Sequence, residues 1–203
     1  GLVANKMWEW VEDRCPIRAI TNAVNLHYWQ DNRMKTDNLE ALLEAKKEMK
    51  KEEIETRVEK AKLLFKQGFN CSQSVFAACA DLYGIDDEAF ALRISASFGG
   101  GIGRMRQTCG AACGMFMLAG LENGSSIPGD ANGKKENYSL VQDLAAKFKE
   151  ENGSLICSEL LGIAPKPQEP TPEARTEAYY QKRPCVEMVA SAVRIFLTNR
   201  NHK

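Results

Sequence analysis

Apolar side chains recur at helical spacing from residue 39 onward. A repeat of three- and four-residue steps begins at Leu39 and continues to Leu64, which is the period of one apolar helix face. Thr36 or Asp37 can cap this helix at its start, and Gly68 can end it. The pattern therefore predicts a long amphipathic helix that begins near residue 37.

Shorter runs with the same period follow, bounded by capping or breaking residues. Asn70 and Thr108 stand before two of these runs, and Gly84 and Gly153 follow two runs, as expected at helix starts and ends. The predicted helices cover residues 71–83, 87–97, 109–121, 134–150 and 185–199, with a helical turn at 154–161 and a brief helix that starts at Thr171-Pro172. No segment alternates apolar and polar residues with period two, which argues against strands. We therefore expect an all-α fold with a single bundle-like helical domain over residues 37–203.

Residues 1–36 differ from the rest of the chain. All three tryptophans, Trp8, Trp10 and Trp29, stand here among polar residues without a clean helical period. We expect an aromatic-rich N-terminal arm that docks on the helical domain or on a second copy of the chain, which would give a homodimer. The arm contains one thiol, Cys15, and we expect it to supply no ligand to a metal site.

Composition and charge narrow the range of partners. Hydrophobic residues make up 44% of the 203 residues, enough for a core of ordinary size. Lys plus Arg and Asp plus Glu both number 27, so no net positive field attracts nucleic acid or an anionic membrane. The longest apolar run, residues 111–121, is far shorter than the ~20 residues of a membrane span, and no signal segment opens the chain. We expect a soluble, cytoplasmic protein that binds no nucleic acid and does not insert into membranes.

The cysteine and histidine counts limit the chemistry. Seven cysteines are an odd number in a chain of this size, unlike the even set of a small secreted disulfide scaffold. The two histidines are His27 and His202. A metal site would therefore use thiolates or carboxylates, and a hydrolase of the Ser-His-Asp or Cys-His type would have to take its base from His27. Such a hydrolase is disfavoured.

A glycine-rich loop at residues 99–103 lacks the features of a nucleotide site. The dinucleotide fingerprint requires glycine at its sixth position, where this chain has Arg104, and it requires a preceding strand, where a helix is predicted. The chain also lacks a Walker-type Gly-Lys-Ser or Gly-Lys-Thr sequence. The loop is interpreted as a tight turn that lets two helices approach closely, or as an anion-binding nest assisted by Arg104 and Arg106.

Four cysteines, called the site cysteines below, share a position at helix starts. Each lies in the first turn of a predicted helix, where free backbone N–H groups and the helix dipole stabilise a thiolate. They are Cys71, Cys109, Cys157 and Cys185. Cys79 and Cys113 lie inside predicted helices, and we expect them to pack in the core. No pair has the CxxC spacing, which excludes the thioredoxin motif and the zinc ribbon.

The site cysteines carry a resemblance to a known family. Residues 109–114, Cys-Gly-Ala-Ala-Cys-Gly, fit a CGAxxG motif, and residues 69–72, 157–160 and 184–185 look like the segments of three further characteristic cysteines. Over about residues 54–197 the chain resembles the family of redox-active proteins labelled C_GCAxxG_C_C. The resemblance implies a small helical protein with a redox role and no defined substrate. Cys113 occupies a free position of the motif, so the resemblance gives it no role.

The residues and the resemblance together suggest one four-thiolate site in which all four site cysteines are ligands. An iron–sulfur cluster is the first expectation for its occupant and zinc the second, because both accept four cysteines. The implied function is electron transfer or redox sensing, as an oxidoreductase component with a redox partner protein that the sequence does not identify. Two alternatives stay open: a metal-free thiol–disulfide protein, and a helical interaction module held by a zinc staple. Gly110 and Gly114, four residues apart, would admit either a neighbouring helix or a cofactor.

Overall fold

The structure is a computed structural model that describes residues 36–200, with side chains from residue 50 onward. The chain divides into two compact units, residues 1–50 and 51–203, and the residues that form the candidate site belong to the second. The predicted aromatic arm and its homodimer contact lie outside the described residues, as do Cys15 and His27.

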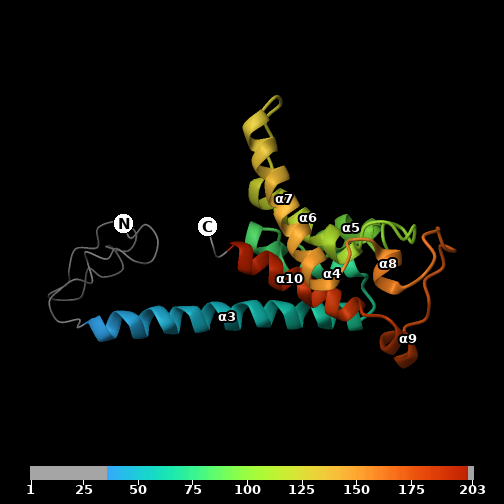
Figure 1. Ribbon diagram of the computed structural model, residues 1–203, viewed down its shortest axis with the longest axis horizontal. Helices are drawn as coiled ribbons and strands as arrows, with labels where there is room; N and C mark the ends of the chain where they lie inside the picture. The colour runs from blue at the N-terminus through green and yellow to red at the C-terminus, as the bar shows by residue number, and fades with distance from the viewer. Residues whose placement is uncertain (1–35, 201–203) are drawn as a thin grey trace. The chain divides into compact units, whose positions relative to one another are not determined.

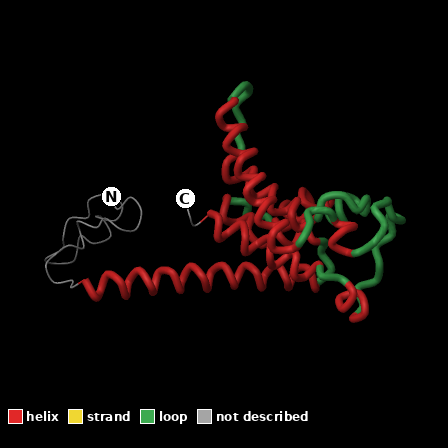
Figure 2. The backbone as a smooth tube through the Cα atoms, viewed as in Figure 1, coloured by secondary structure: helices red, strands yellow, loops and turns green. Residues whose placement is uncertain are grey.

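The described residues fold into helices joined by loops (Figure 1; Figure 2). In chain order they are α3 (Thr36–Lys66), α4 (Cys71–Cys79), the 3-10 helix η1 (Ala80–Tyr83), α5 (Glu88–Ser95), the 3-10 helix η2 (Ala96–Phe98), α6 (Gly110–Asn123), α7 (Ala131–Asn152), α8 (Cys157–Leu161), α9 (Glu177–Lys182) and α10 (Cys185–Arg200). Within residues 36–200 no strand forms, and one isolated antiparallel bridge joins Thr108 to Ile156. The predicted all-α fold is confirmed. Across the same residues, no helix has both the length and the apolar character of a bilayer span.

The core of the second unit lies between five helices and the end of α3. Helix α4 packs on α5, α6 and α10, and α6 also packs on α7 and α10. These helices bury large apolar side chains, among them Phe65, Met115, Phe148 and Phe196, and burial of each contributes roughly 1.5–3 kcal/mol. Long loops gather with α8 and α9 at one end of this core (Figure 2), and the candidate site is at that end.

Two glycines let α6 approach its neighbours closely. A Cβ atom on Gly114 would lie 2.8 Å from the carbonyl oxygen of Ser72, and one on Gly110 would lie 2.9 Å from the carbonyl oxygen of Phe98 and 3.3 Å from Cβ of Cys71. Distances below 3 Å leave no room for a methyl group against backbone. Of the two uses expected for these glycines, the described contacts show close packing on α4 and η2.

The start of α4 is fixed by its predicted cap. The Asn70 side chain accepts hydrogen bonds from the backbone N–H groups of Ser72 and Gln73. The Gln73 side chain accepts in return from the backbone N–H of Asn70, at 3.0 Å, which completes a capping box. Cys71 is consequently held as the first residue of the helix.

The start of α6 differs by one residue from the prediction. Thr108 is predicted as the cap, but Cys109 is the N-cap residue and the helix begins at Gly110. Thr108 pairs instead with Ile156 in the antiparallel bridge. Cys109 therefore lies at the edge of the helix and not inside its first turn.

Helix α9 also begins later than predicted, at Glu177 instead of Thr171-Pro172. Residues 163–176, called the strap below, contain four prolines and form no helix, because proline lacks the backbone donor that a helix needs. The hydroxyl of Thr176 then caps α9 by accepting from the backbone N–H of Tyr179. The strap consequently runs in an irregular, non-helical course from α8 to α9.

Candidate functional site

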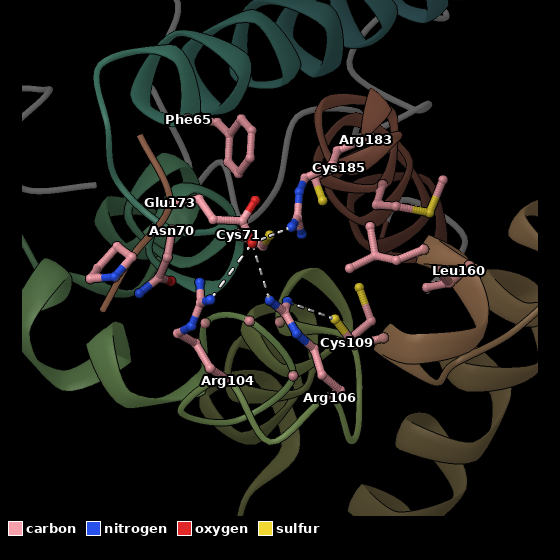
Figure 3. Close-up of a pocket in the computed structure, with 18 of the residues that line it drawn as sticks. Phe65, Asn70, Cys71, Arg104, Arg106, Cys109, Leu160, Glu173, Arg183 and Cys185 are labelled. Atoms are coloured by element: carbon pink, nitrogen blue, oxygen red, sulfur yellow. Dashed lines mark hydrogen bonds and ion pairs between the residues drawn. The ribbon is translucent and has the colours of Figure 1, made fainter. Parts of the chain in front are cut away.

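A cavity of about 390 Å³ lies at the loop end of the second unit (Figure 3). The glycine loop forms part of its wall, and the strap contributes Pro170 and Glu173 among others. All four site cysteines line it: Cys71, Cys109, Cys157 and Cys185. The other described cysteines, Cys79 and Cys113, are buried and do not line the cavity. Four thiols that are distant in sequence therefore border one cavity.

Each site cysteine stands at a helix N-terminus. Cys71, Cys157 and Cys185 are the first residues of α4, α8 and α10, and Cys109 is the N-cap of α6. Burial raises the pKa of the Cys109 thiol to about 12, while hydrogen bonds from backbone N–H groups in the first turn of α6 oppose this effect. The same donors would stabilise the thiolate if a bound metal ion displaced the thiol proton.

Backbone pairing places Cys109 and Cys157 on neighbouring segments. The N–H of Cys109 donates to the carbonyl of Leu155 at 2.7 Å, and the N–H of Cys157 donates to the carbonyl of Gln107 at 2.7 Å. The glycine loop passes directly over this pair of segments, since a Cβ on Gly101 would lie 2.6 Å from Cβ of Cys157. The loop is therefore a tight turn that packs on a site cysteine.

Cys71 and Cys185 form a hydrogen-bonded thiol pair. The bond to Cys185 is the main reason that the pKa of Cys71 lies well above its ordinary value, and burial adds to the effect. The same bond lowers the pKa of Cys185 to about 7, against the effect of burial and with help from the positive charges of Arg183, Arg106 and Arg175. Cys185 therefore ionises at a lower pH than Cys71, which keeps its proton and donates to Cys185.

This pairing predicts a pH dependence for modification of the reduced, metal-free protein. Because the pKa of Cys185 is lowered to about 7, its thiolate is populated above that pH and lost below it, whereas an ordinary thiol has a pKa of about 8.5. The rate of Cys185 alkylation by iodoacetamide, followed by peptide mass spectrometry, should have its midpoint near pH 7. Cys71→Ala removes the donor and should move the midpoint upward. A midpoint at or above about 8.5 in the unaltered protein would contradict the assignment.

Arg106 is a buried cation beside a site cysteine. Its side chain is 3% exposed, and its Nη1 lies 3.8 Å from Sγ of Cys157 while its Nε donates to Oε1 of Gln168 at 3.0 Å. Burial raises the pKa of the Cys157 thiol, and the contact with Arg106 and its charge oppose that shift. Arg106 therefore stabilises negative charge on Cys157.

The strap contributes residues that the sequence pattern did not indicate. Arg175 donates to the carbonyl oxygens of Phe65 (2.7 Å) and Phe69 (2.9 Å), and its guanidinium lies 4.3 Å from the ring centroid of Phe65. These contacts tie the strap to the end of α3, where free helix carbonyls favour a cation. Glu173 lines the same cavity beside Arg104, Arg106 and Arg183 (Figure 3). The prolines predicted a connection without helix, but the partners of Arg175 are more than 100 residues away in sequence.

The site cysteines border the cavity without surrounding a common point. Among the described residues, no group of three or more His, Cys, Asp or Glu side chains is arranged to hold a metal ion. The donor set itself, four thiols and no imidazole, is the one that iron–sulfur clusters and structural zinc accept. Binding of either would require the thiol side chains to turn toward one centre.

Comparison with known proteins gives one family and two relatives. The family described as "Putative redox-active protein (C_GCAxxG_C_C)" matches residues 69–198. An uncharacterized protein of Archaeoglobus fulgidus is 28% identical over 156 residues, which cover 73% of this chain and 95% of that protein. The uncharacterized protein MJ1631 of Methanocaldococcus jannaschii is 39% identical over 69 residues, which cover 32% of this chain and only 13% of that protein's length. No solved structure matches the chain.

Proposed function

This chain belongs to the C_GCAxxG_C_C family of redox-active proteins, and from that membership we propose that its four-cysteine cavity is a redox site that holds an iron–sulfur cluster. The main support is that all four site cysteines, from four separate segments, line one cavity. We propose electron transfer or redox sensing as the role of the site, in the cytoplasm and with a redox partner protein.

The four thiols are the right kind of ligands for such a group, provided that their side chains turn toward one centre. Four cysteines are the usual protein ligands of a cluster, and hydrogen bonds to the sulfurs tune its potential. Cys109 already receives backbone hydrogen bonds at the start of α6, and Arg106 lies against Cys157. When bound, a cluster would supply one-electron chemistry. The chain's own part is to hold the four sulfurs, to stabilise their negative charge and to limit access of water through the strap.

A metal-free thiol–disulfide function is the second candidate, favoured by the Cys71–Cys185 pair. The Cys185 thiolate would attack a disulfide of a partner protein, forming a mixed disulfide and releasing one partner thiolate. Cys71, after losing its proton, would then attack Cys185 sulfur and release the second partner thiolate. The partner disulfide is thereby reduced to a dithiol by two electrons, and Cys71 and Cys185 become a disulfide.

Anaerobic purification followed by metal, sulfide and thiol analysis separates the candidates. The cluster predicts bound iron with inorganic sulfide and a visible absorption that dithionite bleaches. Stoichiometric zinc that survives both oxidant and reductant would overturn the cluster in favour of a zinc-stapled module. Absence of metal, with two thiols that titrate reversibly against a glutathione buffer, would overturn it in favour of the Cys71–Cys185 dithiol.

A further inference from the structure

Three arginines in the same cavity converge on one carboxylate oxygen. Oε1 of Glu173 lies 2.6 Å from Nη2 of Arg183, 3.6 Å from Nη2 of Arg104 and 3.9 Å from Nη2 of Arg106. Figure 3 shows the three guanidinium groups directed at Glu173, two from the residues just after the glycine loop and one from the segment before α10. These three residues are called the arginine cluster below.

The arginine cluster has more positive charge than its partner can balance. The side chains of Arg104, Arg106 and Arg183 are only 20%, 3% and 16% exposed, and Glu173 supplies a single negative charge. Charged groups withdrawn from water need counter-charge and hydrogen bonds to remain stable. The other acceptors around the arginine cluster are the side-chain oxygen of Gln168, the backbone carbonyl of Glu169 and the sulfur of Cys157. The charges of Arg183 and Arg106 also act on the Cys185 thiolate, so Glu173 and Cys185 together supply two negative charges to three guanidinium groups.

The backbone of the glycine loop and of the residues just after it is strained in a way that positions two of these arginines. Arg104 and Arg106 have φ values of 64° and 62°, and Ile102 between the glycines has 59°. Non-glycine residues rarely adopt this left-handed region, at a cost of order 1–3 kcal/mol each. The strain is retained in a loop whose arginine side chains both point into the cavity (Figure 3).

Glu173 is the movable member of the group. It belongs to the non-helical strap and its side chain is 45% exposed, so it can leave the cluster without unfolding a helix. Burial would raise its pKa, but the hydrogen bond from Arg183 and the charges of the cluster lower the pKa below its ordinary value. The arginine cluster thus holds the ionised carboxylate of Glu173, a group that the protein itself supplies.

We propose that the arginine cluster is a binding site for a small oxyanion, a phosphate group or the carboxylates of a small molecule, and that Glu173 occupies it until such a ligand displaces it. The parallel N–H groups of a guanidinium match the paired oxygens of a phosphate or a carboxylate. Because the cluster shares its cavity with the site cysteines, the bound anion would lie beside the thiols. The proposal does not depend on which group the cysteines hold.

Titration calorimetry with inorganic phosphate and with succinate, at constant ionic strength set by chloride, tests this site. Glu173→Gln removes the competing carboxylate and should bind one of the two probes about tenfold more tightly than the unaltered protein. Arg183→Gln should weaken binding about tenfold or more. Arg194→Gln removes an arginine that pairs with Glu55 elsewhere on the surface, and it should leave the affinity unchanged.

Two results would overturn the anion site. One is no saturable binding of either probe to Glu173→Gln, and the other is equal weakening by Arg183→Gln and Arg194→Gln. If Arg183→Gln fails to fold, Arg104→Gln makes the same comparison. Iron is measured on each sample. Absence of anion binding by Glu173→Gln that retains its iron counts against the anion site alone, and absence of iron in protein that still binds the anion counts against the iron–sulfur cluster alone.

Discussion

Replacing Cys109 by serine should remove bound iron from the anaerobically purified protein, leaving less than about a tenth of the unaltered content. Cys109 lines the cavity and is anchored by its backbone bond to Leu155, so its loss leaves three thiols where four are needed. Substitutions that only support a ligand cost about 10- to 100-fold in metal affinity, and loss of a ligand should cost at least as much.

Cys79→Ser is the matched control for this experiment. Cys79 is fully buried in α4 and its pKa is raised to about 12 by burial, but it does not line the cavity. The control should keep its iron, with a loss of stability only. Equal loss of iron in two variants that both retain native helical circular dichroism would show that Cys109 is not an iron ligand. The Cys71–Cys185 dithiol, in contrast, should survive Cys109→Ser with its exchange activity intact.

Gly101→Ala is expected to be strongly destabilising, because it combines a left-handed backbone with a steric clash. Gly101 has a φ of +71°, and an added Cβ would lie 2.6 Å from Cβ of Cys157 and 2.9 Å from Cα of Arg106. The left-handed backbone costs about 1–2 kcal/mol for alanine, and overpacking adds about 1–3 kcal/mol. Urea denaturation should therefore show a loss of about 2–5 kcal/mol in the free energy of unfolding.

Gly84→Ala separates the backbone effect from the steric one. Gly84 has nearly the same φ, +72°, with nothing within 4 Å of an added Cβ. Its substitution should cost only about 1–2 kcal/mol and leave the alkylation rate of the site cysteines unchanged, whereas Gly101→Ala should alter the rate at Cys157. Equal destabilisation by the two substitutions would mean that the loop does not press on Cys157.

Helix positions followed from local patterns in the sequence. The apolar period from Leu39 to Leu64 and the cap at Asn70 depend on neighbouring residues only, and α3 and α4 begin where these signals predict. The placement of the site cysteines at helix starts followed in the same way. Cys109 is the cap of α6 and not, as predicted, part of its first turn, because Thr108 pairs with the distant residue Ile156. The residues near Thr108 in sequence carry no signal of this pairing.

The contacts of the arginine cluster with Glu173 could not be predicted from the sequence. Glu173 and Arg104 are distant in the chain, and their contact depends on the path of the strap over the cavity. Prolines in residues 164–172 predicted a connection without helix, which is what forms. Proline fixes local backbone angles but carries no information about which distant groups the segment meets.

Iron K-edge X-ray absorption on the anaerobically purified full chain tests the four-cysteine redox site most directly. The proposed cluster predicts sulfur as the sole ligand type in the first shell, together with iron neighbours in the second shell, and an edge that shifts on reduction with dithionite. The signal should be lost in Cys109→Ser and kept in Cys79→Ser. Oxygen or nitrogen ligands to the iron, or purified protein that binds no iron under anaerobic conditions, would contradict the site.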